Sequence, residues 1–339
     1  MNDLIISSTM QKSFPTLIQG LRKAQNIFDS ITSFEDIERK FLKGAGLSPN
    51  TYRSYLQAVR QFYDFSFGLN PLQVRPGDIE AFYDDLVTKV DRNTAYLRIR
   101  GLKKFFSGIR NVIPFYTSPF EIMSKKLSEK LNRTKKGNRK KKALNKGEMK
   151  GLLAWLQEDQ TLMGLCNYAM TFMLLTSGLR ASELCQLTWA SLEYFEGKWT
   201  AQFIGKGDRQ AEQELYTLAV EAAKAYFRAQ YGRDPQPADH LYWTISTYEG
   251  ETIRPMTYAT LLLRVKNIGE AAREAGIIMR NVHFTPHLMR RSYATGLYKS
   301  GMGIKAIQNK TRHQSLDTLT THYISDDDSA SPFIEKMLA

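Results

Sequence analysis

With 339 residues, the chain is long enough for two domains that each bury a core of their own. Its 47 Lys and Arg residues against 34 Asp and Glu residues give a net charge of +13 and a pI near 9.5, which favours DNA or RNA as the partner over an acidic small molecule. A disulfide framework and a membrane protein are excluded, because the chain has only two cysteines and no apolar run of bilayer length, so a cytoplasmic location is expected. A generally basic protein without a nucleic-acid partner is the alternative that charge alone leaves open.

Residues 48–106 carry apolar and aromatic side chains at the spacing of amphipathic helices. Ser48 can cap a first helix, and Pro76 and Asn93 stand where a second and a third helix begin. No stretch of period two interrupts these patterns. An all-helical N-terminal domain is therefore predicted over residues 1–132.

A basic segment follows this domain. Residues 133–142 contain no apolar side chain and cannot join a core, so residues 133–143 are predicted to form an interdomain linker. Its charge density would let it lie along DNA phosphates. The residues expected to bind DNA are Arg133, Lys135, Lys136, Arg139, Lys140, Lys141 and Lys142 in the linker, with Arg98 and Lys103 on the third helix. A solvated surface without DNA contact is the alternative for each of them.

Residues 144–339 are predicted to form a second domain, which is also mainly helical. The apolar run 162–175 predicts a buried helix that Gly178 ends. From residue 199 the period becomes two, and strands are predicted at 199–204 and 214–218 on either side of a glycine-flanked turn. The predicted fold class is therefore mainly α with a small antiparallel β-sheet in the C-terminal domain.

Two parts of this second domain suit the binding of a phosphate. His287 and Arg290 are three residues apart, on one face of a helix that Pro286 helps to start. Arg180 follows the helix-breaking Gly178 at the entrance to a new helix, where backbone amides also favour anions. Guanidinium groups bind phosphate oxygens through paired hydrogen bonds, so these positions predict a phosphate site.

These pieces resemble the active site of the tyrosine recombinases, the phage integrase-like enzymes. S-G-L-R-x-S-E-L at 177–184, G-K-G at 205–207 and H-x-x-R-R-S-Y-A-T at 287–295 occur in the order and approximate spacing of that family. The resemblance covers about residues 144–330, and S-x-x-T-x-x-x-Y at 48–55 is similar to the family's helical core-binding domain. The resemblance implies a two-domain, DNA-clamping architecture. The catalytic residues that it implies are Arg180, Lys206, His287, Arg290, His313 and Tyr323, with Glu183 in support.

The roles that the resemblance implies agree with the chemistry of phosphoryl transfer. A phenol has a pKa of about 10, so Tyr323 needs help to lose its proton as it attacks a phosphodiester. The two arginines would bind the nonbridging oxygens, His287 would accept the proton, and His313 would donate to a phosphate oxygen. Lys206 would protonate the departing 5′ oxygen, and Glu183 would orient the site. The implied product is a 3′-phosphotyrosine link, which needs neither ATP nor a metal, so no cofactor is expected.

Two departures from the family pattern concern the end of the site. His313 and Tyr323 are one residue farther apart than is usual in the family. The residues 310–312, Lys-Thr-Arg, replace the apolar-Gly pair that usually precedes the histidine. Tyr323 is the expected nucleophile, and Tyr293 and Tyr298 are the alternatives, although both fit the pattern of core aromatic residues.

Other functions fit the sequence less well than that of a recombinase. A metal-dependent nuclease needs converging carboxylates, and the consecutive acidic residues 326–328 would not face one way on a helix. A zinc site at His283 and His287 is opposed by Pro286 between them. A DNA-binding regulator would lack catalytic residues, and none is missing. A type IB topoisomerase is opposed by the recombinase-like N-terminal region.

The resemblance also implies the partners. Double-stranded DNA recombination sites would be held two at a time by a homo-tetramer, with a dimer on each site and residues 331–338 packing on a neighbouring subunit. A Xer-like or transposon-type recombinase is expected, because no separate arm-binding domain is visible. The sequence names no accessory protein and no target site, and it does not distinguish integration, excision, inversion and dimer resolution.

Overall fold

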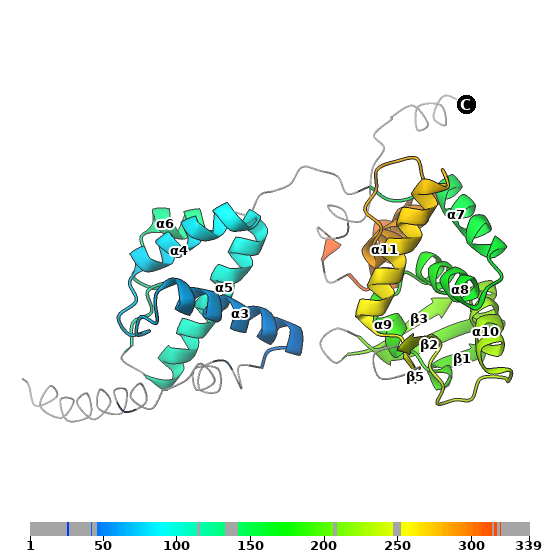
Figure 1. The fold of residues 1–339 in the computed structure, drawn as a ribbon, viewed down its shortest axis with the longest axis horizontal. Coiled ribbons are helices and arrows are strands. Elements are labelled where there is room, and N and C mark those ends of the chain that lie inside the picture. Colours follow the sequence, from blue (N-terminus) through cyan, green and yellow to red (C-terminus); the bar gives the residue numbers. More distant parts are fainter. Residues whose placement is uncertain are drawn as a thin grey trace, which may run out of the picture. The chain divides into compact units, whose positions relative to one another are not determined.

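The structure is a computed structural model, in which the chain forms two compact units, Met1–Gly137 (unit 1) and Asn138–Ala339 (unit 2) (Figure 1). Both units are mainly helical and unit 2 contains small antiparallel sheets, so the predicted fold class is confirmed. No described helix is long and apolar enough to span a bilayer. The structure describes residues 46–113, 116–132, 142–205, 209–246 and 252–313, with Asn26, Leu42, Ser315, Leu316 and Leu319.

Unit 1 is built from helices whose starts follow the sequence signals. Its helices in the described part are α3 (Pro49–Phe65), α4 (Pro76–Lys89), α5 (Arg92–Val112) and α6 (Lys125–Asn132). The Ser48 side chain accepts a hydrogen bond from the backbone N–H of Thr51 and caps α3 as predicted. Helix α5 begins at Arg92, one residue before the predicted start, because the carboxylate of Asp91 caps it.

The core of unit 1 depends on the close approach of α3 and α5. The ring of Phe62 packs edge-on against the rings of Phe82 and Phe106, at centroid distances of 5.3 and 6.3 Å. Where α5 crosses α3, a Cβ atom added to Gly101 would lie 2.9 Å from the Cβ of Ala58 and 3.1 Å from the Cα of Tyr55. Only glycine therefore fits at this crossing.

Unit 2 is organised around α8, the apolar helix that the sequence predicts. Helix α8 is buried along most of its length and packs against α7, α10, α11 and α12. Asn145 and Glu148 form a reciprocal capping box at the start of α7, with N···O distances of 2.8 and 2.9 Å. The helices described in this unit are α7 (Lys146–Glu158), α8 (Leu162–Ser177), α9 (Ala181–Gln186), α10 (Thr217–Tyr231), α11 (Tyr258–Glu274), α12 (Pro286–Lys299) and α13 (Ile304–Thr311), with a 3-10 turn at Trp189–Ser191.

The main sheet has the antiparallel order β1-β2-β3, from Leu192–Phe195, Lys198–Ile204 and Gln210–Leu215. The predicted strand at 214–218 was wrong, because β3 starts four residues earlier and α10 already begins at Thr217. Ile204 pairs with Gln210, so β3 begins directly after the turn of the hairpin. Most residues of β3 are polar, and the apolar pattern therefore did not reveal where the strand starts. A second hairpin, β4 (Trp243–Ser246) and β5 (Thr252–Pro255), was not predicted.

Residues 142–144, the first described residues of unit 2, form hydrogen bonds to α12 and to Arg280. The backbone N–H of Leu144 donates to the buried Ser292 Oγ at 2.9 Å, and Arg291 donates to the carbonyl oxygen of Lys142 at 2.9 Å. Arg280 donates to the carbonyl oxygen of Ala143 at 2.8 Å. At residues 142–144 the chain is therefore fixed to the helix that carries His287 and Arg290.

Replacing Gly101 by alanine is expected to destabilise unit 1 by about 1–3 kcal/mol, because the added methyl group forces α3 and α5 apart and outweighs alanine's higher helix propensity of about 1 kcal/mol. All four tryptophans, Trp155, Trp189, Trp199 and Trp243, lie in unit 2. In urea unfolding of the full chain, the helical circular dichroism signal should therefore be lost earlier, while the tryptophan fluorescence transition stays in place.

Gly77→Ala is the matched control, because Gly77 also lies in a helix of unit 1 and nothing lies within 4 Å of a Cβ added there. Its unfolding curve should equal that of the wild type or shift to slightly higher urea. Equal behaviour of the two variants would show that α3 and α5 do not approach as closely as described.

Candidate active site

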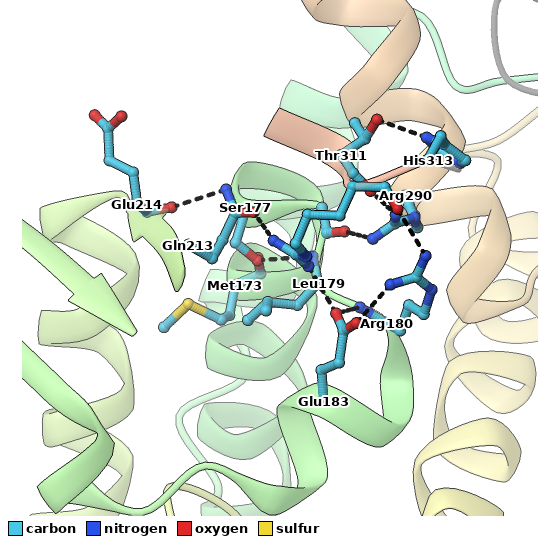
Figure 2. Close-up of polar contacts among 12 residues, drawn as sticks. Met173, Ser177, Leu179, Arg180, Glu183, Gln213, Glu214, Arg290, Thr311 and His313 are labelled. Atoms are coloured by element: carbon cyan, nitrogen blue, oxygen red, sulfur yellow. Dashed lines mark hydrogen bonds and ion pairs between the residues drawn. The ribbon is translucent and has the colours of Figure 1, made fainter. Parts of the chain in front are cut away.

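The turn between α8 and α9 presents Arg180. Gly178 ends α8 with a φ of +63°, and a Cβ at this position would overlap the ring of Tyr293. Ser177 Oγ donates to the carbonyl oxygen of Met173 at 2.6 Å and accepts from the N–H of Leu179 at 3.2 Å (Figure 2). The chain therefore reverses within a few residues and places Arg180 as the N-cap residue of α9.

Glu183 is a buried carboxylate that holds two arginines. It accepts from the backbone N–H and the Nη1 of Arg180 at 2.8 and 2.6 Å, and from Nη2 of Arg312 at 2.7 Å. Burial by itself raises the pKa of Glu183, but the charge of Arg312 and the hydrogen bonds and charge of Arg180 outweigh it, so the net shift is downward. Glu183 is therefore ionised at neutral pH and fixes the direction of both guanidinium groups.

Arg290 is the most deeply placed cation of the site. Its side chain lies on α12, it is 1% exposed, and its guanidinium donates to the carbonyl oxygens of Gly178 and Thr311. These carbonyls stand two residues before Arg180 and two residues before His313, respectively. Arg290 thus joins the α8–α9 turn to the end of α13 (Figure 2).

His313 follows α13 and is held from several sides. Its Nδ1 lies 2.6 Å from Thr311 Oγ1, and its backbone N–H and carbonyl oxygen bond to Gln308 at 3.1 and 3.0 Å. Burial, followed by the charges of Arg290, Arg180, Arg312 and His287, lowers the pKa of His313 to about 3. His313 is therefore neutral at pH 7, and its imidazole can take part in hydrogen bonding without carrying a charge.

Arg312 belongs to this cluster, although no function was predicted for it from the sequence. Its backbone has a φ of +53°, a left-handed conformation that costs a residue other than glycine roughly 1–2 kcal/mol. Its guanidinium contacts Glu183, donates to Gln213 Oε1 on β3, and lies 4.9 Å from the ring centroid of Phe203 on β2. Its carbonyl oxygen accepts from Nη2 of Arg180 at 3.2 Å. The only sequence signal was its departure from the family pattern.

The structure thus brings together the predicted residues Arg180, Glu183, Arg290 and His313, with His287 close enough for its charge to affect His313. His287 is exposed and Arg290 is buried, one turn apart on α12. The predicted acid Lys206 and the predicted nucleophile Tyr323 lie outside the described residues.

The alternative nucleophiles lie on α12. Tyr293 is half-buried beside Gly178, and burial raises its pKa, which opposes the formation of a phenolate. Tyr298 is 38% exposed. Tyr293 is therefore the less suitable nucleophile of these two.

The residues predicted to bind DNA have different environments. Lys103 and Lys142 are exposed. Arg98 turns instead toward α3 and donates to the carbonyl oxygen of Ser54 at 3.2 Å, and burial lowers its pKa. The predictions for Arg133, Lys135, Lys136, Arg139, Lys140 and Lys141 lie outside the described residues.

The charges of the cluster suit an anion. The cluster contains three guanidinium groups, those of Arg180, Arg290 and Arg312, and the carboxylate of Glu183, which contacts the first and the third. Positive charge therefore exceeds negative charge in a largely buried environment, where electrostatic interactions are stronger than in water. Within the described ranges, no three His, Cys, Asp or Glu side chains are placed to hold a metal ion.

His313 is expected to make the stability depend on pH below neutrality. Its pKa is about 6.5 in the unfolded chain and about 3 in the folded protein, so the unfolded state binds more protons between these values. Stability should therefore fall as the pH drops below about 6.5. In urea unfolding, the midpoint should fall less for His313→Gln than for the wild type between about pH 7.5 and about pH 5, since glutamine takes up no proton.

His283→Gln is the control, because this histidine is exposed at the approach to α12. This variant should keep the pH dependence of the wild type. An identical loss of stability in His313→Gln and the wild type would contradict the described burial of His313.

Comparison with known proteins gives a consistent relationship. The sequence matches the phage integrase family over residues 142–330 and the phage integrase N-terminal SAM-like domain over residues 35–111. Tyrosine recombinase XerD of Listeria monocytogenes is 24% identical over 288 residues, which are 84% of this chain and 91% of that protein. XerD of Pseudomonas aeruginosa is 26% identical over 275 residues, which are 80% of this chain and 86% of that protein.

Solved structures share the fold. The XerH site-specific recombinase, bound to a palindromic difH substrate in a post-cleavage complex, has a TM-score of 0.68 and 19% identity, covering 94% of this chain and 88% of that chain. The Tn1549 transposon integrase in complex with transposon right end DNA has a TM-score of 0.63 and 19% identity, covering 91% and 100%. The first family match alone spans more than half of the sequence. The chain therefore belongs to the phage integrase family of tyrosine recombinases.

Proposed function

We propose that this protein is a site-specific recombinase that cleaves and rejoins DNA strands through a 3′-phosphotyrosine intermediate, without a metal ion or ATP. The observation that carries the proposal is the convergence of Arg180, Arg290 and His313 from three separate segments on one positively charged cluster. Membership of the phage integrase family supports DNA as the substrate. The proposed partners are double-stranded recombination sites.

The proposed reaction is an in-line displacement at phosphorus. The Oη of Tyr323 forms a bond to the scissile phosphorus, its proton passes to His287, and the bond from phosphorus to O5′ breaks. Lys206 gives a proton to the departing O5′. In the second half, a 5′ hydroxyl attacks the phosphotyrosine and the same steps run in reverse. The phosphodiester energy is kept in the protein–DNA bond, so religation requires no ATP.

The described side chains support a role in stabilising the transition state. Negative charge on the nonbridging oxygens must be bound as the five-coordinate phosphorus forms. A guanidinium group has five N–H donors, so Arg180 and Arg290 can keep protein contacts and still donate to phosphate oxygens. The lowered pKa of His313 supports a neutral imidazole. We assign its single N–H to Nε2, which would donate to a phosphate oxygen, while Nδ1 accepts from Thr311 Oγ1.

We further propose a separate function for each of three segments of the chain. Residues 1–132 form a core-binding domain, residues 133–143 a linker that follows the DNA backbone, and residues 144–339 the catalytic domain. The similar structures of the XerH recombinase and the Tn1549 integrase are complexes with DNA, which supports duplex DNA as the partner here. A tetramer on two sites, with residues 331–338 packing on a neighbouring subunit, is the proposed assembly.

Covalent capture tests the proposed function. The protein is incubated with fragmented genomic DNA in EDTA and denatured, and the DNA that remains attached to protein is isolated and sequenced. The wild type should yield an adduct at one shared DNA sequence, because the intermediate is covalent and needs no metal. Tyr323→Phe should yield none, since it lacks the attacking oxygen.

The outcomes separate the possibilities. An adduct that persists in Tyr323→Phe would move the nucleophile to another residue. Absence of any adduct from the wild type, together with DNA binding in a gel-shift experiment, would favour a DNA-binding regulator and contradict the proposal.

A further inference from the structure

We propose that Arg312 is a positioning residue that keeps the charge of Arg180 available for the scissile phosphate, by sharing the carboxylate of Glu183. The inference rests on the proposed function, because it concerns the group that Arg180 would bind. It adds to the site a residue that lies on neither of the two arginine motifs identified in the sequence.

Arg312 holds Arg180 through two connections. Its Nη2 lies 2.7 Å from Glu183 Oε2, while Arg180 Nη1 binds the other oxygen of the same carboxylate at 2.6 Å. Its own carbonyl oxygen accepts from Arg180 Nη2 at 3.2 Å. Both terminal nitrogens of Arg180 are therefore directed by groups that Arg312 supplies or binds.

The balance of charges around Glu183 explains how Arg312 affects Arg180. The side chain of Glu183 is 4% exposed, so its charge is poorly screened by water. If Arg180 were its only partner, the two charges would cancel, and Arg180 would attract an anion weakly. Arg312 supplies a second positive charge to the same carboxylate, so the pair of arginines keeps an excess of positive charge next to Arg180.

The sheet fixes the place of the Arg312 guanidinium. It donates to Oε1 of Gln213, a side chain that is 4% exposed on β3, and lies over the ring of Phe203 on β2. Planar guanidinium groups can bond in their plane and stack on a ring at the same time, which a lysine cannot do. Arg312 thus connects the β2–β3 hairpin to α9 at Glu183.

The backbone conformation of Arg312 shows that this residue does more than end α13. Residue 312 is the C-cap of α13 with a φ of +53°, a conformation that glycine adopts without strain. A residue needed only to end the helix would therefore be better as glycine. Arg312→Gly consequently removes the side-chain contacts while leaving the turn favourable, which makes it a clean test variant.

The experiment is a charge-rescue comparison on the DNA duplex recovered by covalent capture. A nick near the cleavage point lets the cleaved fragment diffuse away, so the adduct accumulates. The rate constant of adduct formation at saturating DNA is measured for the wild type, Arg312→Gly, Glu183→Gln and the double variant. Urea midpoints confirm that each variant is folded under the assay conditions.

Arg312→Gly should lower this rate constant by about tenfold. Loss of a group that binds the transition state directly would lower it more, by ~10²–10³. Adding Glu183→Gln should restore part of the rate, because glutamine keeps the shape of Glu183 and removes the charge that captures Arg180. The double variant should therefore be faster than Arg312→Gly alone. Arg312→Lys should be intermediate, since it keeps the charge and loses the fork.

Lys310→Ala is the control for loss of a nearby positive charge, because Lys310 pairs with Glu214 at 2.9 Å, away from Glu183. It should react at nearly the wild-type rate. A double variant slower than Arg312→Gly would overturn the inference, since independent structural defects multiply. An unchanged rate in Arg312→Gly would overturn it too. Absence of an adduct from the wild type would instead overturn the proposed function, and the inference with it.

Discussion

The candidate active site depends on the buried guanidinium of Arg290. A cation with 1% exposure is stable only if its donors are satisfied, and Arg290 bonds to the carbonyl oxygens of Gly178 and Thr311. Those two carbonyls belong to the segments that lead to Arg180 and to His313. Separating either segment from α12 would remove one of these two hydrogen bonds from a buried cation, which costs about 1–3 kcal/mol. The requirement of one side chain therefore holds three distant parts of the sequence together.

The second constraint is charge. A cluster of arginines repels itself unless it contains a counter-ion, but a counter-ion for every arginine would leave nothing to bind a phosphate. Here one buried carboxylate, Glu183, is shared by Arg180 and Arg312, while Arg290 donates to two neutral carbonyls. Burial, and after it the charges of these arginines, lowers the pKa of His313 and keeps it uncharged. A bound phosphate would complete the balance.

Local signals in the sequence predicted much of the fold. The caps at Ser48 and Asn145, the apolar run of α8 and the stop at Gly178 depend on neighbouring residues, and the structure confirms them. The position of β3 was wrong, because its register is set by pairing with β2 and its own residues are mostly polar. The hydrogen bond from Arg98 to a carbonyl of another helix was not predicted either, and the role of Arg98 in DNA binding stays a prediction. Such contacts depend on tertiary packing and leave no local signal.

The sequence motifs predicted which residues belong to the site, but they did not predict the contacts among those residues. The motif gave Arg180, Glu183, Arg290 and His313 but could not show that Glu183 is shared, since the second partner takes a position where the family usually has glycine. Arg312 looked like a deviation in sequence and is a contact residue in the structure. Lys206 and Tyr323 stay predictions from sequence.

The measurement that tests the central claim most directly is the mapping of the covalent adduct. The DNA of the denatured adduct is trimmed by nuclease, the protein is cut with trypsin, and the peptides are examined by mass spectrometry. Tyr323 is the only tyrosine in the peptide 313–336, whereas Tyr293 and Tyr298 both lie in the peptide 292–299. The predicted result is a nucleotide joined through its 3′ phosphate to peptide 313–336, with fragmentation assigning the linkage to Tyr323. The same mass on peptide 292–299, or on any other residue, would contradict the account.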